Sequence, residues 1–186
     1  MVLEAPQLEA ALRLTGQRLA QRGVEEKIRL YLVGGTAGLL SGLLSGTRST
    51  GDVDVTDTEP SRAWEAIVQA AAEAAKELDL PETWLNNKCS MYAWYLPLGW
   101  KGRCVLARTY GPLEVWLLDR RDFIAAKIVS APKRPQDFED LLAVGPSEEE
   151  LAFAEENLDR VERESPDPDQ SFEDARAILD ALRGET

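Results

Sequence analysis

The chain alternates between segments of two hydrophobic periods, and this alternation predicts a mixed fold of helices and strands. Residues 6–22 repeat leucine and alanine at helical spacing and end at Gly23, which predicts an amphipathic helix. Residues 27–33 read KIRLYLV and predict a strand, because they first alternate and then become fully apolar. The pair Gly34-Gly35 follows as a turn, and residues 36–44 predict a short buried helix.

The remaining pattern continues this alternation. Strands are predicted at residues 52–56, 91–95, 103–109 and 113–118, and helices at residues 61–78, 121–130 and 136–142. Two later helices each begin with a capping-box pattern, SEEE from Ser147 and SFED from Ser171. We therefore expect an α/β (α+β) domain over residues 1–145, with a mixed sheet flanked by helices, and an acidic helical extension over residues 146–186.

Composition narrows the chemistry that this fold can perform. Hydrophobic residues make up 44% of the 186 positions, which is enough for a sizeable core. The chain has no histidine, which excludes Ser-His-Asp and Cys-His catalysis and any zinc site that needs imidazole. Two cysteines, Cys89 and Cys104, without a recognisable signal peptide favour a reducing cytoplasm, although a pairing across a hairpin stays open.

The net charge of −12 is unevenly distributed along the chain. Residues 136–186 hold 17 acidic and 4 basic residues, whereas residues 1–135 hold 16 acidic and 17 basic residues. Such an acidic run most often forms a solvated helical face. Residues 101–135 are locally basic and are suited to meet phosphates, while the overall acidity argues against non-specific duplex binding.

An uncharged stretch at residues 31–47 raises the question of a membrane span, because Gly38, Gly42 and Gly46 repeat at the spacing of membrane helix contacts. The stretch lies near the lower length limit for crossing a bilayer and is broken by the glycine pair. Close packing of a helix on the sheet is the better interpretation, and we expect no membrane partner. Among the aromatic residues, Trp64 and Trp84 are expected in the core, with stacking on a base as the alternative for Trp84.

The first candidate chemistry lies in GDVDV, residues 51–55. Asp52 and Asp54 alternate with Val53 in a predicted strand, so both carboxylates project from one face while Val53 and Val55 face the core. Two neighbouring carboxylates repel unless a cation lies between them, and Mg²⁺ prefers such oxygen ligands. A bare D-x-D is nevertheless common on solvent-facing strands, so this pair alone is a weak signal.

The second candidate feature is the Gly34-Gly35 turn before a helix. Without Cβ atoms the backbone can approach a ligand closely, and the free N–H groups of the helix, with the Thr36 hydroxyl, favour an anion. The alternative is an ordinary tight turn with Thr36 as the N-cap. Arg48 and Thr50 offer further charge and hydroxyl groups to phosphate oxygens. An anion site beside a Mg²⁺ site, with Mn²⁺ as an alternative ion, is what nucleotidyl or phosphoryl transfer requires.

Taken together, GGTAGLLSGLLSGTRSTGDVDV resembles the signature of the DNA polymerase β-like nucleotidyltransferase superfamily. The RSTGDVD ending is similar to bacterial nucleotidyltransferase-like families that include the abortive-infection type IV toxins, and residues 113–142 resemble an uncharacterised bacterial family of that group. The resemblance implies that Gly34, Gly35 and Thr36 hold a triphosphate and that Asp52 and Asp54 bind Mg²⁺.

The resemblance also implies roles for later residues. Lys127 stands where the toxin families have a lysine that contacts the nucleotide, and Arg134, Asp137 and Asp140 match an R-x-x-D-x-x-D pattern, with Asp137 as an active-site acid. From the residues alone, Lys127 also fits an ordinary surface lysine. Many superfamily members have a third metal-binding carboxylate. Glu114 is the candidate here, and Asp137 is the alternative if Glu114 faces solvent.

These implications lead to an expected function, a toxin–antitoxin version of it, and one alternative. We expect a Mg²⁺-dependent nucleotidyltransferase that moves an NMP from an NTP to an RNA, a protein or a small molecule. The toxin resemblance adds an antitoxin protein as a partner, and the acidic composition favours a protein or small-molecule acceptor. The alternative is a non-catalytic protein that binds a nucleotide or a partner, whose effect would survive Asp52→Asn.

Overall fold

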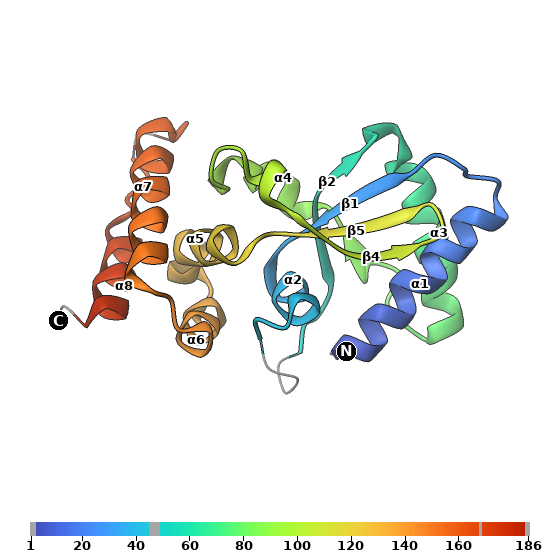
Figure 1. The fold of residues 1–186 in the computed structure, drawn as a ribbon, viewed down its shortest axis with the longest axis horizontal. Helices are drawn as coiled ribbons and strands as arrows, with labels where there is room; N and C mark the ends of the chain where they lie inside the picture. Colours follow the sequence, from blue (N-terminus) through green and yellow to red (C-terminus); the bar gives the residue numbers. More distant parts are fainter. Residues whose placement is uncertain (1–2, 45–48, 168, 185–186) are drawn as a thin grey trace. The chain divides into compact units, whose positions relative to one another are not determined.

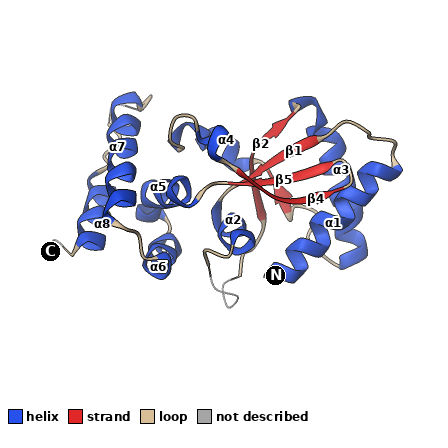
Figure 2. Ribbon diagram, viewed as in Figure 1, coloured by secondary structure: helices blue, strands red, loops and turns tan. Residues whose placement is uncertain are grey.

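The computed structural model describes residues 3–44, 49–167 and 169–184, and these residues contain a five-stranded mixed sheet flanked by helices (Figures 1 and 2). This is the expected α+β class. The chain forms two compact units. The first comprises Met1–Ala93 and Cys104–Leu118, and the second comprises Trp94–Arg103 and Asp119–Thr186. Each unit is described by itself below.

The first unit contains the whole sheet, in the order β3-β2-β1-β5-β4. Strand β1 pairs antiparallel with β2 and parallel with β5, β2 pairs parallel with β3, and β4 pairs antiparallel with β5. The strands span Ile28–Leu32 (β1), Val53–Glu59 (β2), Leu85–Asn86 (β3), Val105–Tyr110 (β4) and Leu113–Leu117 (β5).

Three helices accompany this sheet: α1 (Ala5–Gln21), α2 (Gly34–Ser41) and α3 (Trp64–Leu78). Helices α1 and α3 pack against each other, and α1 also packs on β4 and β5 (Figure 1). Helix α1 lies close to β4 at Gly16, where a Cβ atom would lie 2.2 Å from the Tyr110 carbonyl oxygen. The leucines of α1 and the alanine face of α3 supply buried side chains to this core: Leu8, Leu12, Leu19, Ala70, Ala71, Ala74 and Ala75.

The second unit is helical in its described residues. Its helices are α4 (Trp100–Arg103), α5 (Arg120–Ser130), α6 (Pro135–Val144), α7 (Glu148–Glu164) and α8 (Glu173–Arg183). Its core contains the buried side chains Ile124, Ile128, Leu141, Leu151, Leu158, Val161, Phe172 and Leu179. Helices α5 and α6, which we expected in the first domain, share a core with α7 and α8 in the second compact unit.

Most predicted elements are confirmed, but residues 91–95 are not a strand. They belong to the 3₁₀ segment η2, Lys88–Tyr95. In the second unit, side chains of α7 satisfy backbone carbonyls that a strand partner would otherwise bind. The Arg160 guanidinium donates to the carbonyls of Trp94 and Leu96 at 2.9 Å, and the Asn157 amide donates to that of Tyr95 at 2.9 Å. The alternation in MYAWY, residues 91–95, therefore does not reflect pairing with another strand.

Two helix starts also differ from expectation. The capping box at Ser147 forms as predicted, whereas Ser171 is not the N-cap of α8, which begins after Phe172 without a side-chain cap. Helix α2 begins at Gly34, so the glycine pair forms its first turn and does not precede it. Cys89 and Cys104 form no disulfide within the described residues. No described helix combines the length and the apolar character needed to cross a membrane.

Candidate functional site

The Asp52–Asp54 pair lies at the start of β2, and its alternation is as the sequence predicted. Val53 and Val55 are fully buried, whereas both aspartates are only partly buried. The two valines anchor this end of the strand in the core. The carboxylates consequently extend from a fixed backbone.

Two hydroxyl groups hold the backbone of Asp52. The Thr36 hydroxyl in α2 donates to the Asp52 carbonyl at 2.8 Å, and the Thr50 hydroxyl donates to the same oxygen at 3.1 Å. Thr50 is itself fixed by a two-way backbone pairing with Leu3, with N–O distances of 2.7 and 3.0 Å. Thr36 and Thr50, both expected at the triphosphate, thus position Asp52 in this structure. Arg48, the other predicted anion ligand, lies outside the described residues.

The Asp52 carboxylate has a partner that the sequence pattern did not single out. The side-chain amide of Asn86 donates to Asp52 Oδ2 at 2.9 Å, and Asn86 Oδ1 accepts the Lys88 backbone N–H at 3.1 Å. In the parallel pairing of β2 with β3, Asn86 is also the register partner of Asp54. In the sequence, the one sign of this contact was the asparagine pair in WLNN, residues 84–87. Strand β3 has only two residues, which is too short for hydrophobic periodicity to reveal it.

Asp54 lies against the beginning of α2. The Val33 backbone N–H donates to the Asp54 carbonyl at 3.1 Å, and a Cβ on Gly34 would lie 3.1 Å from Asp54 Oδ2. Gly34 also has φ +66°, in the left-handed region. Glycine at this position therefore serves both the backbone turn and the close approach of the carboxylate.

The N-terminus of α2 can receive an anion beside this carboxylate pair. Its N-cap residue, Val33, has no side-chain capping hydrogen bond. As in any helix, the N–H groups of the first turn, which includes Gly34 and Gly35, have no acceptor within the helix. The helix dipole also favours negative charge at this end. The predicted residues Gly34, Gly35, Thr36, Thr50, Asp52 and Asp54 are thus brought together in the first unit.

Glu114 is not brought to this pair. On β5 it is in register with Arg29 of β1, whereas Asp54 bonds to Val33 at the opposite end of β1. The four-residue offset corresponds to about 13 Å along the strands. Glu114 instead accepts from the Trp116 indole at 3.3 Å and lies 4.0 Å from the Arg29 guanidinium.

Lys127 and Asp137 belong to the second unit, where they form a buried cluster with Asp140. Lys127 is 3% exposed, and its ammonium donates to Asp137 Oδ1 and, at 2.7 Å, to Asp140 Oδ2. The Ser130 hydroxyl donates to the other Asp137 oxygen at 2.6 Å. Lys127 is therefore not a surface lysine, and its ammonium is shared by Asp137 and Asp140.

The donor set at Asp52 and Asp54 fits a hard divalent cation with only two protein carboxylates. Asn86 donates to Asp52 Oδ2, and Asp52 Oδ1 has no hydrogen-bond partner among the described residues. The described part of the chain holds no group of three or more Asp, Glu, His or Cys side chains arranged for a metal. Mg²⁺ commonly binds one or two protein carboxylates and completes its shell with water and phosphate oxygens.

Comparison with known proteins agrees with this geometry. A family model described as "Nucleotidyltransferase of unknown function (DUF6036)" matches residues 11–167, which include most of both compact units. Neither a curated protein nor a solved structure matches the chain. On the strength of the family match, the chain belongs to this family of nucleotidyltransferases of unknown function.

Proposed function

We propose that this protein is a Mg²⁺-dependent nucleotidyltransferase that moves an NMP from an NTP to an RNA, a protein or a small-molecule acceptor. The observation that carries the proposal is the Asp52–Asp54 pair at the uncapped N-terminus of α2, with Gly34 leaving room for the Asp54 carboxylate. A triphosphate needs both anion donors and a divalent cation, and this arrangement supports both.

In this proposal the residues of the first unit bind and orient the nucleotide. The N–H groups of Gly34 and Gly35 donate to phosphate oxygens, while Asp52 and Asp54 hold Mg²⁺, or Mn²⁺ in its place. Thr36, Thr50 and Asn86 fix the direction of Asp52. Bound Mg²⁺ would supply charge neutralisation at the attacking and leaving oxygens.

The acceptor hydroxyl must also lose its proton. We assign this role to Asp137 or Glu114, the two further carboxylates that the sequence suggested for the active site. Asp137 is hydrogen-bonded to Lys127 and Ser130, which fix its orientation, whereas Glu114 is engaged by Trp116. The contacts within each unit leave both carboxylates as candidates for the base.

The resemblance to abortive-infection type IV toxins supports a finer proposal, in which the protein is the toxin of a bacterial toxin–antitoxin pair and acts in the cytoplasm with an antitoxin partner. Its test is growth arrest on expression. Loss of growth arrest in Asp52→Asn would support a toxic nucleotidyl transfer, whereas growth arrest that persists would contradict it.

A non-catalytic nucleotide- or partner-binding protein is the second candidate function. It is favoured by the amide of Asn86, because a neutral side chain occupies the strand position beside Asp54. In that case nucleotide binding would be retained, but no labelled NMP would reach any acceptor.

The decisive experiment measures thermal stability with each of the four NTPs, with and without Mg²⁺. We expect stabilisation that requires both components in the wild type and is lost in Asp52→Asn. Asp180→Asn, a matched change at an exposed position of α8, should behave as the wild type. Absence of any shift in the wild type would contradict the proposal. A positive result leads to transfer assays with α-labelled NTPs and RNA or protein acceptors.

A further inference from the structure

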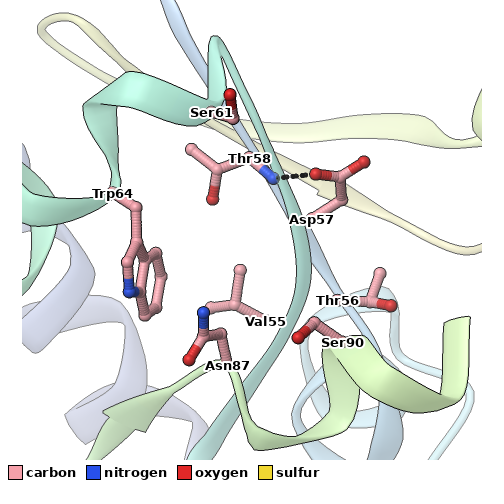
Figure 3. Close-up of a pocket in the computed structure, with 8 residues that line it drawn as sticks. All are labelled: Val55, Thr56, Asp57, Thr58, Ser61, Trp64, Asn87 and Ser90. Atoms are coloured by element: carbon pink, nitrogen blue, oxygen red, sulfur yellow. Dashed lines mark hydrogen bonds between the residues drawn. The ribbon is translucent and has the colours of Figure 1, made fainter.

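A cavity opens beside β2 immediately after the carboxylate pair. Strand β3 pairs with β2 only at Val53 and Asp54, because β3 ends at Asn86 and the chain continues into η2. The cavity has a volume of about 230 Å³ (Figure 3). Its lining residues are Val55, Thr56, Asp57, Thr58, Ser61, Trp64, Asn87 and Ser90.

The lining provides an aromatic surface and neutral polar groups. Figure 3 shows the Trp64 indole and the Asn87 amide on the same side of β2 as Val55 and Thr58. Trp64, which we expected in the core, is only partly buried at the first position of α3. The side chains of Trp64, Asn87, Ser61 and Ser90 make no hydrogen bond within the described residues.

The charge of the lining excludes an anionic ligand group. Among the described residues, the lining contains no lysine, arginine or histidine and one carboxylate, that of Asp57, which accepts the Thr58 backbone N–H at 2.7 Å. A phosphate would find no cation there. A flat, uncharged ring with polar edges would find both an apolar face and hydrogen-bonding partners.

The size of the cavity agrees with such a ring. The volume lies below the about 300 Å³ at which pockets enclose a drug-sized ligand, so a single heterocycle is a suitable occupant. Val55 directly follows Asp54, and Asn87 directly follows Asn86, which holds Asp52. The cavity is therefore adjacent in the sequence to the proposed metal ligands, while Val55, which lines it, points to the opposite face of β2 from Asp54.

We propose that this cavity binds a nucleobase, stacked on Trp64 and hydrogen-bonded at its edge by Asn87. The inference rests on the proposed function for the source of the base, which is the donor NTP or a nucleotide of an RNA acceptor.

The test compares Trp64→Leu, Trp64→Phe and Asn87→Ala with the wild-type protein. Dissociation constants are measured by calorimetry for the four NTPs with Mg²⁺, for the four ribonucleosides without metal, and for a short single-stranded RNA. Trp100→Leu in α4 of the second unit is the matched control. Circular dichroism melting verifies folding, and Trp64→Phe preserves an aromatic ring if Trp64→Leu is unstable.

If the base belongs to the NTP, Trp64→Leu should weaken NTP binding by about tenfold or more, as expected for the loss of one stacked base. If it belongs to the acceptor, the same variant should weaken RNA binding and leave NTP binding unchanged. Trp64→Phe should retain most of the affinity in either case. Asn87→Ala should reduce the preference among the four bases.

Unchanged binding of every probe in Trp64→Leu, or an equal loss in Trp100→Leu, would overturn the inference. The ribonucleosides separate this result from failure of the proposed function, because they carry no phosphate and need no metal. Wild-type protein that shows no Mg²⁺-dependent NTP binding but binds ribonucleosides through Trp64 would remove the proposed reaction and retain the nucleobase cavity. Wild-type protein that binds no ribonucleoside, NTP or RNA would remove both.

Discussion

The side-chain amide of Asn86 and the carboxylate of Asp52 are joined by a hydrogen bond of 2.9 Å. Asn86 is at the same time the register partner of Asp54 on the neighbouring strand. A neutral amide thus lies beside the two carboxylates, where it orients one of them without adding negative charge. In the proposed metal site, this relationship would influence how strongly the pair binds a cation before a nucleotide arrives.

Asn86→Asp should increase the affinity for Mn²⁺ or Mg²⁺ in the absence of nucleotide. The added carboxylate supplies a third hard oxygen ligand, and without metal it repels Asp52 and lowers the melting temperature. Metal titration by calorimetry and melting with and without metal measure both effects. Asn87→Asp adds the same charge one residue further along and should leave metal affinity near that of the wild type. Equal gains in the two variants would contradict this role of Asn86.

Gly34→Ala should reduce both stability and metal-dependent nucleotide binding. The left-handed backbone at φ +66° costs about 1–2 kcal/mol with a Cβ, and that Cβ would lie 3.1 Å from Asp54 Oδ2. Gly42→Ala is a matched control, since Gly42 has φ +77° and no atom near its Cβ position. We expect similar losses in urea denaturation for the two variants, and lost NTP binding for Gly34→Ala alone.

Lys127→Met should destabilise the protein strongly. It leaves the carboxylates of Asp137 and Asp140 buried without their shared cation, a change that costs about 3–5 kcal/mol. Urea denaturation at pH 7 measures the loss. Lys133→Met, at an exposed lysine nearby in the chain, should change stability by less than about 0.5 kcal/mol. A Lys127→Met protein as stable as the wild type would show that the cluster does not stabilise the fold.

Glu150 should make stability depend on pH. Burial acts to raise the pKa of Glu150, but hydrogen bonds from Ser147 and the ion pair with Arg120 outweigh it, so the pKa is lowered. A lowered folded-state pKa stabilises the protein fully above the unfolded value of about 4.3, and this stabilisation is lost as pH falls through the folded value.

The corresponding variant is Glu150→Gln. At pH 7 we expect it to be less stable than the wild type by about 0.5–1 kcal/mol, and the difference should disappear at a pH below the lowered pKa. Denaturation measured at a series of pH values from 7 downwards gives both values. Glu149→Gln, an exposed neighbour in the same helix turn, should show a smaller change. A difference that grows as the pH falls would contradict the assigned sign.

The sequence by itself determined the features that depend on chain neighbours. Strand β1, the glycine pair after it and the D-x-D alternation follow from local periodicity, because successive strand residues point to opposite faces whatever lies beside them. The capping box at Ser147 and the N-terminal helix were predictable for the same reason. Trp84, expected in the core, is 1% exposed and donates its indole N–H to the Ala71 carbonyl.

Only the tertiary structure decided the features that depend on register and on distant residues. Asn86 reaches Asp52 because a two-residue strand pairs with β2, and Glu114 is kept from the pair because the parallel register of β5 aligns it with Arg29. The cavity beside Trp64 exists because β3 ends at Asn86. Local periodicity cannot specify where a strand ends or which residue faces it across the sheet, since these follow from packing of the whole core.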